Sequence, residues 1–410
     1  MISVSSSQAR KILFISIFYA PEQIGVSKYT TEKAEWLSRQ GFDVQVVTAF
    51  PFYPEWKPHH GYPRWRFYRE TINNVKIIRC PLWVPKKVNL PSRLIHLASF
   101  SITSSLALLS LVRWTPESVI LIMPTIIPVL AVRLLRMFCG SKLLLHIQDF
   151  ELDLALNFVN RHSTLKRLVT QVDQWLYQHF DTISTISNTM LNRLVYEKDV
   201  APESCFLLPN WVDKKQIYPS SKGHYRVEWG ISREMVIVMY SGNFGQKYDF
   251  DTLFRAAKLL EDEPRIIFVL CGDGASRTHI EQLSLEVRNV RLFPLQPMDR
   301  LNELLNCADI HVLPQRPSAS DSVMPSKLLN IFACAKPVVA TVHSQTELGK
   351  TISKVGITVE PSNPEVLAAA INQLVSDSQQ RLELGEKARD YVLKNFEKES
   401  ILPKLLNHLA

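Results

Sequence analysis

Four short stretches of this sequence carry glycine, lysine, histidine and carboxylate residues that could bind an anion or a sugar. The first is Tyr19-Ala-Pro-Glu-Gln-Ile-Gly25-Val-Ser-Lys-Tyr-Thr, where Gly25 stands near the start of an expected helix. A glycine there lets a ligand approach the backbone, and the free N–H groups and the helix dipole favour an anion. The alternative is an ordinary turn between a strand and a helix.

A second stretch, Tyr240-Ser-Gly242-Asn243-Phe-Gly-Gln-Lys247, leads from an expected strand into a helix that starts near Asp249. Gly242, Asn243 and Lys247 suit a diphosphate, with the lysine as a point charge, and the alternative is a solvated lysine in a turn. After the following strand, Gly272 and Gly274 of Cys-Gly-Asp-Gly would let a base or ribose lie close to the backbone.

The third stretch runs from Asp321 to Lys336, with Pro325 expected at the first helical position. The amides of Ser326 and Lys327 would then lie in the first turn and point at a ligand. Asn330 follows one turn later on the same helix face, and Asp321 stands just outside the helix. Together they could bind a sugar hydroxyl, a diphosphate and a ribose. The alternative is a capped helix with solvated ends.

The fourth stretch, Leu143-Leu-Leu-His146-Ile-Gln-Asp149-Phe-Glu-Leu-Asp153, places a histidine near the end of a strand and carboxylates just beyond it. A lone histidine on a strand is usually a core residue with satisfied hydrogen bonds. At the carboxyl end of a strand, however, His146 and Asp149 would face a ligand, which favours a catalytic role.

The elements that must position these residues follow the rhythm of βαβ units, because short apolar runs alternate with longer segments of helical period. We expect an α/β protein made of two facing, doubly wound, Rossmann-like domains, with the active site in the cleft between them. The expected domains are residues 1–215 and 224–395, joined by a polar linker, with a helix at 396–410 that packs back across the linker. The expected strands are 12–19, 44–48, 75–80, 119–123, 143–147, 182–186, 205–208, 236–240, 266–271, 290–293, 310–313, 338–341 and 357–359.

Charge is distributed unevenly along the chain of 410 residues. The net charge is +8, but residues 1–218 hold 25 Lys and Arg against 16 Asp and Glu, whereas residues 219–410 hold 22 against 23. The first domain is therefore expected to meet an anionic partner: a membrane surface, a phosphorylated substrate or a nucleic acid. The six scattered cysteines indicate reduced thiols in a cytosolic protein, and no signal peptide is expected.

Residues 94–112 form an apolar stretch in which His96 is the only ionisable residue. A helix docked on its own sheet is the favoured interpretation, and the alternatives are partial membrane contact and a transmembrane helix. Basic and aromatic residues around this stretch favour peripheral, salt-sensitive attachment to an anionic membrane surface. These are Arg79, Lys86, Lys87, Arg93 and Arg113, with Trp83, Phe100 and Trp114.

The order of these motifs, with the later run from Pro325 to Thr341, resembles glycosyltransferase family 4 on the two-lobed GT-B fold, over nearly the whole chain. Within that family, the stretches 52–56, 79–86 and 325–327 closely resemble the colanic acid biosynthesis enzymes described as fucosyltransferases. The resemblance implies that Gly25 and Lys247 lie by the donor diphosphate and His146 by the transferred sugar. It also implies nucleoside contacts at Gly272 and Gly274 and phosphate contacts at Ser326 and Lys327.

Two departures from the family pattern concern the donor site. Asn243 stands where the family commonly has an arginine, and Ser322 and Asn330 stand where it has a pair of glutamates. Asn330 can still bond ribose hydroxyls, and Asp321 is the expected replacement for the first glutamate.

The resemblance implies a retaining glycosyltransferase that moves fucose from GDP-fucose, a nucleotide sugar, to a lipid-diphosphate-linked saccharide in exopolysaccharide biosynthesis. No metal or other cofactor is expected, and the expected location is the inner face of the cell membrane. Rival interpretations are a nucleotide-sugar epimerase or phosphorylase on the same fold, and a nonenzymatic membrane-bound scaffold. Nucleic-acid binding is disfavoured, because the basic and aromatic residues of 64–69 alternate as in a half-exposed strand.

Overall fold

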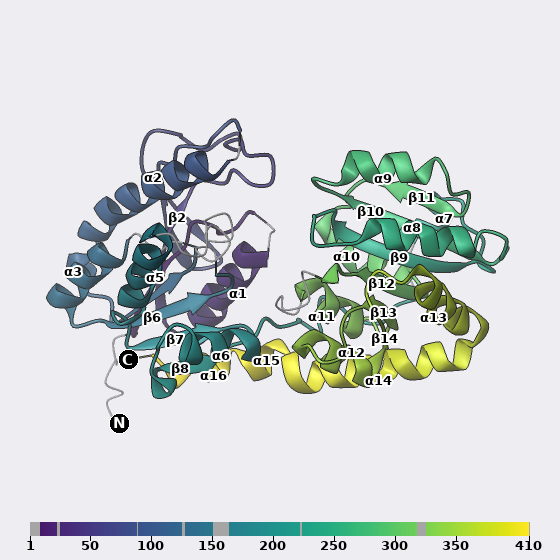
Figure 1. Cartoon of the computed structure of the whole chain (residues 1–410). Coiled ribbons are helices and arrows are strands. Elements are labelled where there is room, and N and C mark those ends of the chain that lie inside the picture. Colours follow the sequence, from purple (N-terminus) through teal and green to yellow (C-terminus); the bar gives the residue numbers. More distant parts are fainter. Residues whose placement is uncertain are drawn as a thin grey trace, which may run out of the picture. The chain divides into compact units, whose positions relative to one another are not determined.

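Two separate β-sheets, each with its own helices, divide the chain into two units (Figure 1). The computed structural model describes residues 9–22, 25–87, 89–124, 128–150, 164–221, 224–317 and 325–409. Unit 1 comprises Met1–Pro209 and Leu402–Ala410, and unit 2 comprises Asn210–Ile401. The chain therefore crosses from one unit to the other at 209/210 and again at 401/402.

Unit 1 is built on an eight-stranded sheet in the order β3-β4-β2-β1-β5-β6-β7-β8. Every neighbouring pair is parallel except β3 with β4, which is antiparallel at the sheet edge. Its strands are β1 (Lys11–Ile15), β2 (Asp43–Ala49), β3 (Tyr68–Ile72), β4 (Val75–Cys80), β5 (Ser118–Ile122), β6 (Lys142–Ile147), β7 (Thr182–Thr185) and β8 (Cys205–Leu207). Its helices include α1 (Gly25–Arg39), α2 (Leu90–Leu109), α3 (Val129–Cys139), α5 (Thr164–Tyr177), α6 (Asn188–Tyr196) and α16 (Pro403–Leu406).

Unit 2 is built on a six-stranded parallel sheet in the order β11-β10-β9-β12-β13-β14. Its strands are β9 (Val236–Asn243), β10 (Ile266–Asp273), β11 (Val290–Phe293), β12 (Ile310–Pro314), β13 (Val338–Thr341) and β14 (Ile357–Val359). Its helices are α7 (Tyr225–Glu228), α8 (Phe250–Leu259), α9 (Arg277–Ser284), α10 (Leu301–Cys307), α11 (Ser326–Ala333), α12 (Glu347–Val355), α13 (Pro364–Ser376), α14 (Ser378–Phe396) and α15 (Lys398–Ile401).

The expected fold class, α/β with two Rossmann-like sheets, is confirmed. Central strands such as β5 are buried along their whole length, as a parallel sheet covered by helices on both faces requires. The single helix expected within 396–410 is instead two short helices, because Pro403 starts α16 and cannot continue the ladder of α15. The predicted place of the active site, in the cleft between the domains, stays a prediction.

Helix α2 lies on unit 1, where it packs against β2, β4 and α3, as the docked interpretation expects. Within the described residues, Pro91–Leu109 is long and apolar enough to cross a membrane by length and composition, and 33% of it is buried. Two residues predicted to face a membrane do not. Arg79 is buried and paired with Glu70, and Phe100 is buried in the core.

Candidate functional site

The predicted donor-binding residues of unit 2 meet where β9 ends and α11 begins. The ammonium group of Lys327 lies 3.8 Å from the centre of the Tyr240 ring and 4.2 Å from that of Tyr248. It also lies 3.4 Å from the carbonyl oxygen of Ser241, to which it donates a hydrogen bond. Two aromatic faces and a carbonyl thus hold this cation beside Gly242.

A second lysine, Lys247, lies close enough to Lys327 to affect its pKa. Burial lowers the pKa of Lys327 well below its usual value, and the positive charge of Lys247 lowers it further. Burial raises the pKa of Tyr240, and raises that of Tyr248 to about 12, so both rings stay neutral at physiological pH. Two lysines that repel one another at a strand end form a site that an anion would stabilise.

Helix α11 starts at Ser326, so Pro325 is its N-cap residue and not the first helical residue that the sequence predicted. No side chain of the described chain caps this helix start. Uncapped N–H groups in the first turn, next to the two lysines, suit the oxygen atoms of a phosphate group.

The structure explains why positions 272 and 274 are glycines, which the sequence did not reveal. A β-carbon on Gly272 would lie 1.9 Å from the carbonyl oxygen of Gly242 on the neighbouring strand. Gly274 has a φ of +150°, and a β-carbon there would lie 2.3 Å from the side chain of Asn243. The space at both positions is therefore filled by the end of β9 and by Phe244, which follows it.

The amide of Asn330 is 9% exposed, and its Oδ1 atom is buried without a hydrogen-bond partner in the described part of the chain. A buried amide oxygen without a partner is costly unless a ligand or a water satisfies it. Asn330 therefore fits a polar ligand contact. Asp321 and Ser322 lie outside the described residues.

In unit 1, His146 lies on β6 between Ile122 of β5 and Ser184 of β7. Its imidazole is buried, and Nδ1 is 2.8 Å from the hydroxyl oxygen of Ser184. That hydroxyl donates to the carbonyl of Leu145, so it accepts from Nδ1–H. This arrangement leaves the lone pair on Nε2, which has no partner among the described residues.

Burial holds the pKa of His146 well below its usual value, and nearby Lys33, whose own pKa burial lowers, acts in the same direction as a smaller cause. The imidazole is therefore neutral at physiological pH. Lys33 lies on α1 and was not among the predicted site residues. Its sequence position, eight residues after Gly25 on the same helix, gave no sign that it would be buried next to the histidine.

The other predicted residues of unit 1 lie near the same edge of the sheet. Gly25 is exposed as the first residue of α1, and Asp149 is exposed two residues after β6. Glu22 was also missed: it is buried and accepts hydrogen bonds of 2.8 Å from the amides of Phe52 and Tyr53. Its partners are some thirty residues away, and only the fold brings them together.

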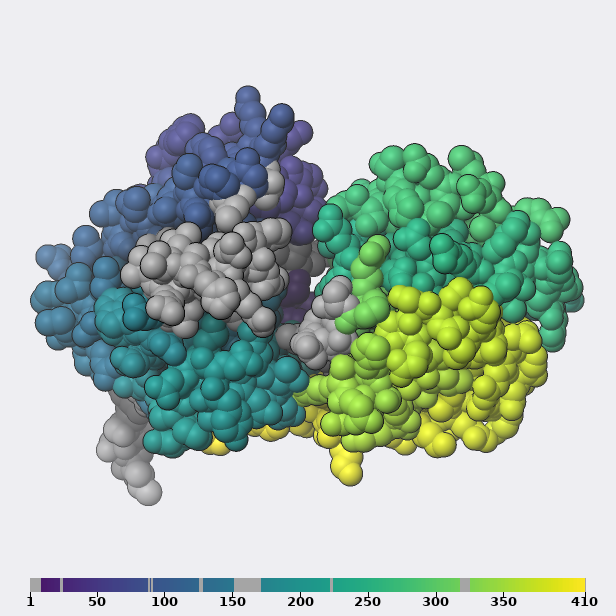
Figure 2. Space-filling model, viewed as in Figure 1, coloured from purple at the N-terminus to yellow at the C-terminus, as the bar shows by residue number. Residues whose placement is uncertain are grey.

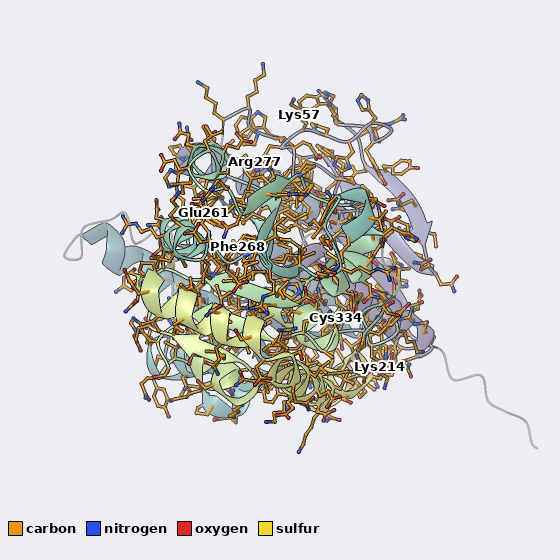
Figure 3. All side chains as sticks on the ribbon, turned by 90° about the vertical axis from the view of Figure 1, so that its right-hand side faces the viewer. Lys57, Lys214, Glu261, Phe268, Arg277 and Cys334 are labelled. Atoms are coloured by element: carbon orange, nitrogen blue, oxygen red, sulfur yellow. The ribbon has the colours of Figure 1, made fainter. Side chains whose placement is uncertain are left out.

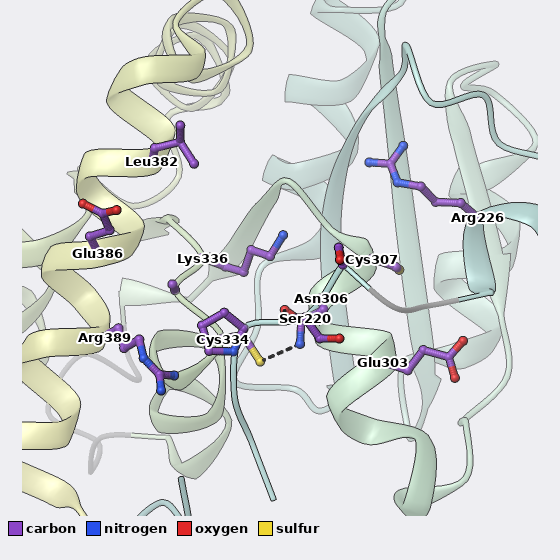
Figure 4. Close-up of a pocket in the computed structure, with 13 residues that line it drawn as sticks. Ser220, Arg226, Glu303, Asn306, Cys307, Cys334, Lys336, Leu382, Glu386 and Arg389 are labelled. Atoms are coloured by element: carbon purple, nitrogen blue, oxygen red, sulfur yellow. Dashed lines mark hydrogen bonds between the residues drawn. The ribbon is translucent and has the colours of Figure 1, made fainter. Parts of the chain in front are cut away.

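Unit 2 also contains a cavity of about 690 Å³ (Figure 4). Its lining includes Asn306 and Cys307 at the end of α10, Cys334 and Lys336 just before β13, and Arg389 of α14. It therefore lies toward the amino ends of the strands, opposite the edge that carries Lys247 and Lys327.

Known proteins resemble this chain over both units. Residues 221–391 match the sequence model of the glycosyl transferases group 1, and residues 25–211 match the glycosyl transferase 4-like domain. The putative colanic acid biosynthesis glycosyl transferase WcaI of Escherichia coli K12 is 35% identical over 97% of this chain and 99% of its own length. The chain belongs to the group 1 glycosyltransferases.

Solved structures of this glycosyltransferase fold agree with the two sheets. Sucrose-phosphate synthase from Thermosynechococcus elongatus superposes with a TM-score of 0.76 at 18% identity, over 97% of this chain and 98% of that chain. The Anabaena protein HepE, solved in complex with UDP and glucose, has a TM-score of 0.65 at 14% identity, over 97% and 98%. The fold of this glycosyltransferase is therefore GT-B, as the sequence predicted.

Proposed function

We propose that this glycosyltransferase transfers fucose from GDP-fucose to a lipid-diphosphate-linked saccharide, with retention of configuration, during exopolysaccharide assembly. The Escherichia coli relative named for colanic acid biosynthesis, similar over nearly the full length of both chains, supports the pathway class. The sequence resemblance to enzymes described as fucosyltransferases supports the sugar.

The observation that carries the donor site is the convergence of Lys247 and Lys327 at the uncapped start of α11. As the bond to the sugar breaks, negative charge builds up on the departing diphosphate. Fixed cations and helix amides in a partly buried site stabilise that charge without reorganising. These groups supply the role that a metal ion would otherwise play, so we propose that the reaction needs none.

His146 has the properties of a group that contacts the transferred sugar. Ser184 fixes its tautomer, and the Nε2 lone pair can accept a hydrogen bond from a sugar hydroxyl. Because the imidazole is neutral at physiological pH, it adds no positive charge next to the cationic character that develops on the sugar ring. Departure and attack on the same face then retain the configuration.

We also propose that unit 1 attaches to the inner face of the membrane through exposed apolar side chains of α2 and α3. Helices α2 and α3 pack side by side, and the segment that contains them covers a continuous part of the surface of unit 1 (Figure 2). We call the following residues the α2–α3 face: Leu94, Ile95, Ile102, Leu106 and Leu109 of α2, and Leu130, Leu134, Met137 and Phe138 of α3.

Charge on this part of unit 1 favours an anionic bilayer over another protein surface. Residues 80–142 contain seven lysines and arginines and one acidic residue, Glu117. Lys86, Lys87 and Arg113 are exposed near the ends of α2. An apolar face with a basic rim is the combination that binds at the interface of an anionic membrane.

Donor binding tests the proposed function directly. We expect GDP-fucose to raise the thermal unfolding midpoint more than other nucleotide sugars do, because a ligand of the folded state stabilises it by mass action. Lys247→Ala should weaken this binding about tenfold, or about 1.4 kcal/mol, through loss of a charge-assisted phosphate contact. The measurement is a thermal shift titration, followed by analysis of products with a lipid-linked acceptor.

The matched control is Arg233→Ala, which removes an exposed cation before β9, at the opposite end of that strand. It should bind the donor as the wild type does. Formation of an isomerised nucleotide sugar, or of a sugar phosphate, would instead establish the epimerase or phosphorylase alternative. A folded protein that no nucleotide sugar stabilises would point to the nonenzymatic scaffold.

A further inference from the structure

The segment between β2 and β3 presents basic and aromatic side chains that the donor site does not use. Lys57, Arg64 and Arg66 of this segment are exposed, as is Arg69 in β3, and among the residues that the structure describes their side chains have no hydrogen-bond or ion-pair partner. Trp65 between them is 82% exposed. Cations without acidic partners, next to an exposed aromatic ring, indicate a surface that meets an anionic and partly apolar ligand.

This segment is firmly held at the carboxyl edge of the unit 1 sheet. At its start, the buried carboxylate of Glu22 binds the amides of Phe52 and Tyr53. Further along, the guanidinium of buried Arg79 lies 5.1 Å from the centre of the Tyr62 ring. Both anchors are buried charged groups, Glu22 and Arg79, and they hold the segment at Phe52, Tyr53 and Tyr62.

The same segment forms an open surface cavity of about 680 Å³. Lys57, His59, His60, Tyr62 and Arg64 line it, together with Glu55, which lies 3.4 Å from the His59 ring. Lys57 lies at the surface of the molecule (Figure 3). The lining thus offers two permanent cations, two imidazoles and a phenol against one carboxylate.

The segment also adjoins the helix that we propose faces the membrane. The ring of His96 on α2 lies 4.8 Å from that of Phe52 and 5.3 Å from that of Trp56. The segment that forms this cavity therefore packs against the first half of α2, one of the two helices that carry the α2–α3 face. The phosphate groups of a lipid lie at the membrane surface when its tail stays in the bilayer.

We propose that the cavity lined by Lys57 and Arg64 binds the diphosphate of the lipid-linked acceptor. This inference rests on the proposed function, because it assumes an acceptor of that class. Lys57 and Arg64 bind the phosphate oxygens, and Trp65 contacts the saccharide or the first carbons of the lipid. Glu55 is the one carboxylate in the lining, and it lies beside His59, so the two permanent cations remain in excess of the acidic groups.

The test compares three probes that share one tail: farnesyl diphosphate, farnesyl monophosphate and farnesol. Binding to the full-length protein is measured by calorimetry with excess GDP, which occupies the donor site. We expect the wild type to bind the diphosphate at least about tenfold more tightly than farnesol, because charge-assisted contacts form only with phosphate. Lys57→Ala with Arg64→Ala should remove that preference.

The control double variant is Arg39→Ala with Arg233→Ala, which removes two exposed cations elsewhere and should keep the preference. An unchanged preference in the Lys57 and Arg64 variant would overturn the proposal. Inorganic diphosphate, phosphatidylglycerol vesicles or a single-stranded oligonucleotide that binds as tightly, with the same dependence on Lys57 and Arg64, would also overturn it. Donor stabilisation should survive in the double variant, so failure here is distinguishable from failure of the donor site.

Discussion

His146 and Lys327 show how burial prepares single side chains for ligands. Each is a basic group whose pKa is lowered by burial and by a neighbouring lysine, Lys33 in one case and Lys247 in the other. The consequences differ. The histidine is neutral and has a buried lone pair available, whereas the amino group of the lysine lies between two tyrosine rings, where an anionic ligand would favour its charged form.

Replacing His146 and its hydrogen-bond partner tests the catalytic role. We expect His146→Ala to lower kcat about a hundredfold or more, the range of general acid–base and polar contacts to the reacting sugar, with little effect on the KM for the donor. Ser184→Ala should lower kcat less, because it frees the tautomer but keeps the imidazole. Steady-state kinetics and urea unfolding of both variants provide the measurement.

The outcome would differ if His146 were only a structural residue of the core. In that case both variants would lose unfolding free energy, and the folded fraction of each would keep the wild-type kcat. Rescue of the Ser184→Ala defect by Ser184→Thr, which restores a hydroxyl, would support the positioning role.

The strands with a regular hydrophobic pattern could be predicted from the sequence. The local geometry at the edges of the sheets could not. Expected strands such as 143–147 and 338–341 agree with β6 and β13 to within one residue. Strand β3 was missed as a paired strand, because its residues are mostly exposed and lack an apolar run. The sequence also could not show that Gly272 makes room for the neighbouring strand, because Gly242 lies thirty residues away.

The same limit applies to the elements that we propose face the membrane. The sequence drew attention to 94–112 and its basic flanks, but it placed buried Arg79 and Phe100 on the surface. It gave no role to α3, whose four exposed apolar residues recur at helical spacing on one face. The exposed apolar residues of α2 and those of α3 come together only because the two helices pack against each other.

Substitutions on α3 test whether the α2–α3 face binds membranes. Met137 and Phe138 are 79% and 71% exposed, so Met137→Glu with Phe138→Glu should leave the fold intact. We expect this variant to lose flotation with anionic liposomes, because both apolar area and charge complementarity are removed. Lys86→Glu with Lys87→Glu should weaken binding mainly at low salt, since each basic residue contributes about 1 kcal/mol near an anionic surface.

Leu285→Glu is the matched control, because Leu285 is an equally exposed apolar residue in unit 2. It should float as the wild type does. Absence of wild-type binding to anionic vesicles at low salt would contradict the proposal. Attachment that survives high salt and alkaline carbonate would show that the helix is inserted in the bilayer.

At the scale of the whole molecule, three buried histidines make the free energy of unfolding depend on pH. His96 and His146 lie in unit 1 and His311 in unit 2, and all three are at most 2% exposed. Burial lowers the pKa of His96 to about 4 and that of His311 to about 3, and places that of His146 well below its usual value. Burial raises the pKa of Glu22, which acts in the opposite direction but is a single group.

We therefore expect the free energy of unfolding to fall on mild acidification. The folded protein keeps these histidines neutral, whereas the unfolded chain protonates each near pH 6.5, so their contribution is fully present above pH 6.5 and is lost below it. At pH 5 the loss is about 2 kcal/mol for each of His96 and His311, and His146 acts in the same direction. Urea unfolding between pH 7.5 and 5 measures it, and His311→Asn should flatten the pH dependence of the unit 2 transition alone. A transition that is independent of pH over this range would mean that the three imidazoles bind protons equally in the folded and unfolded states.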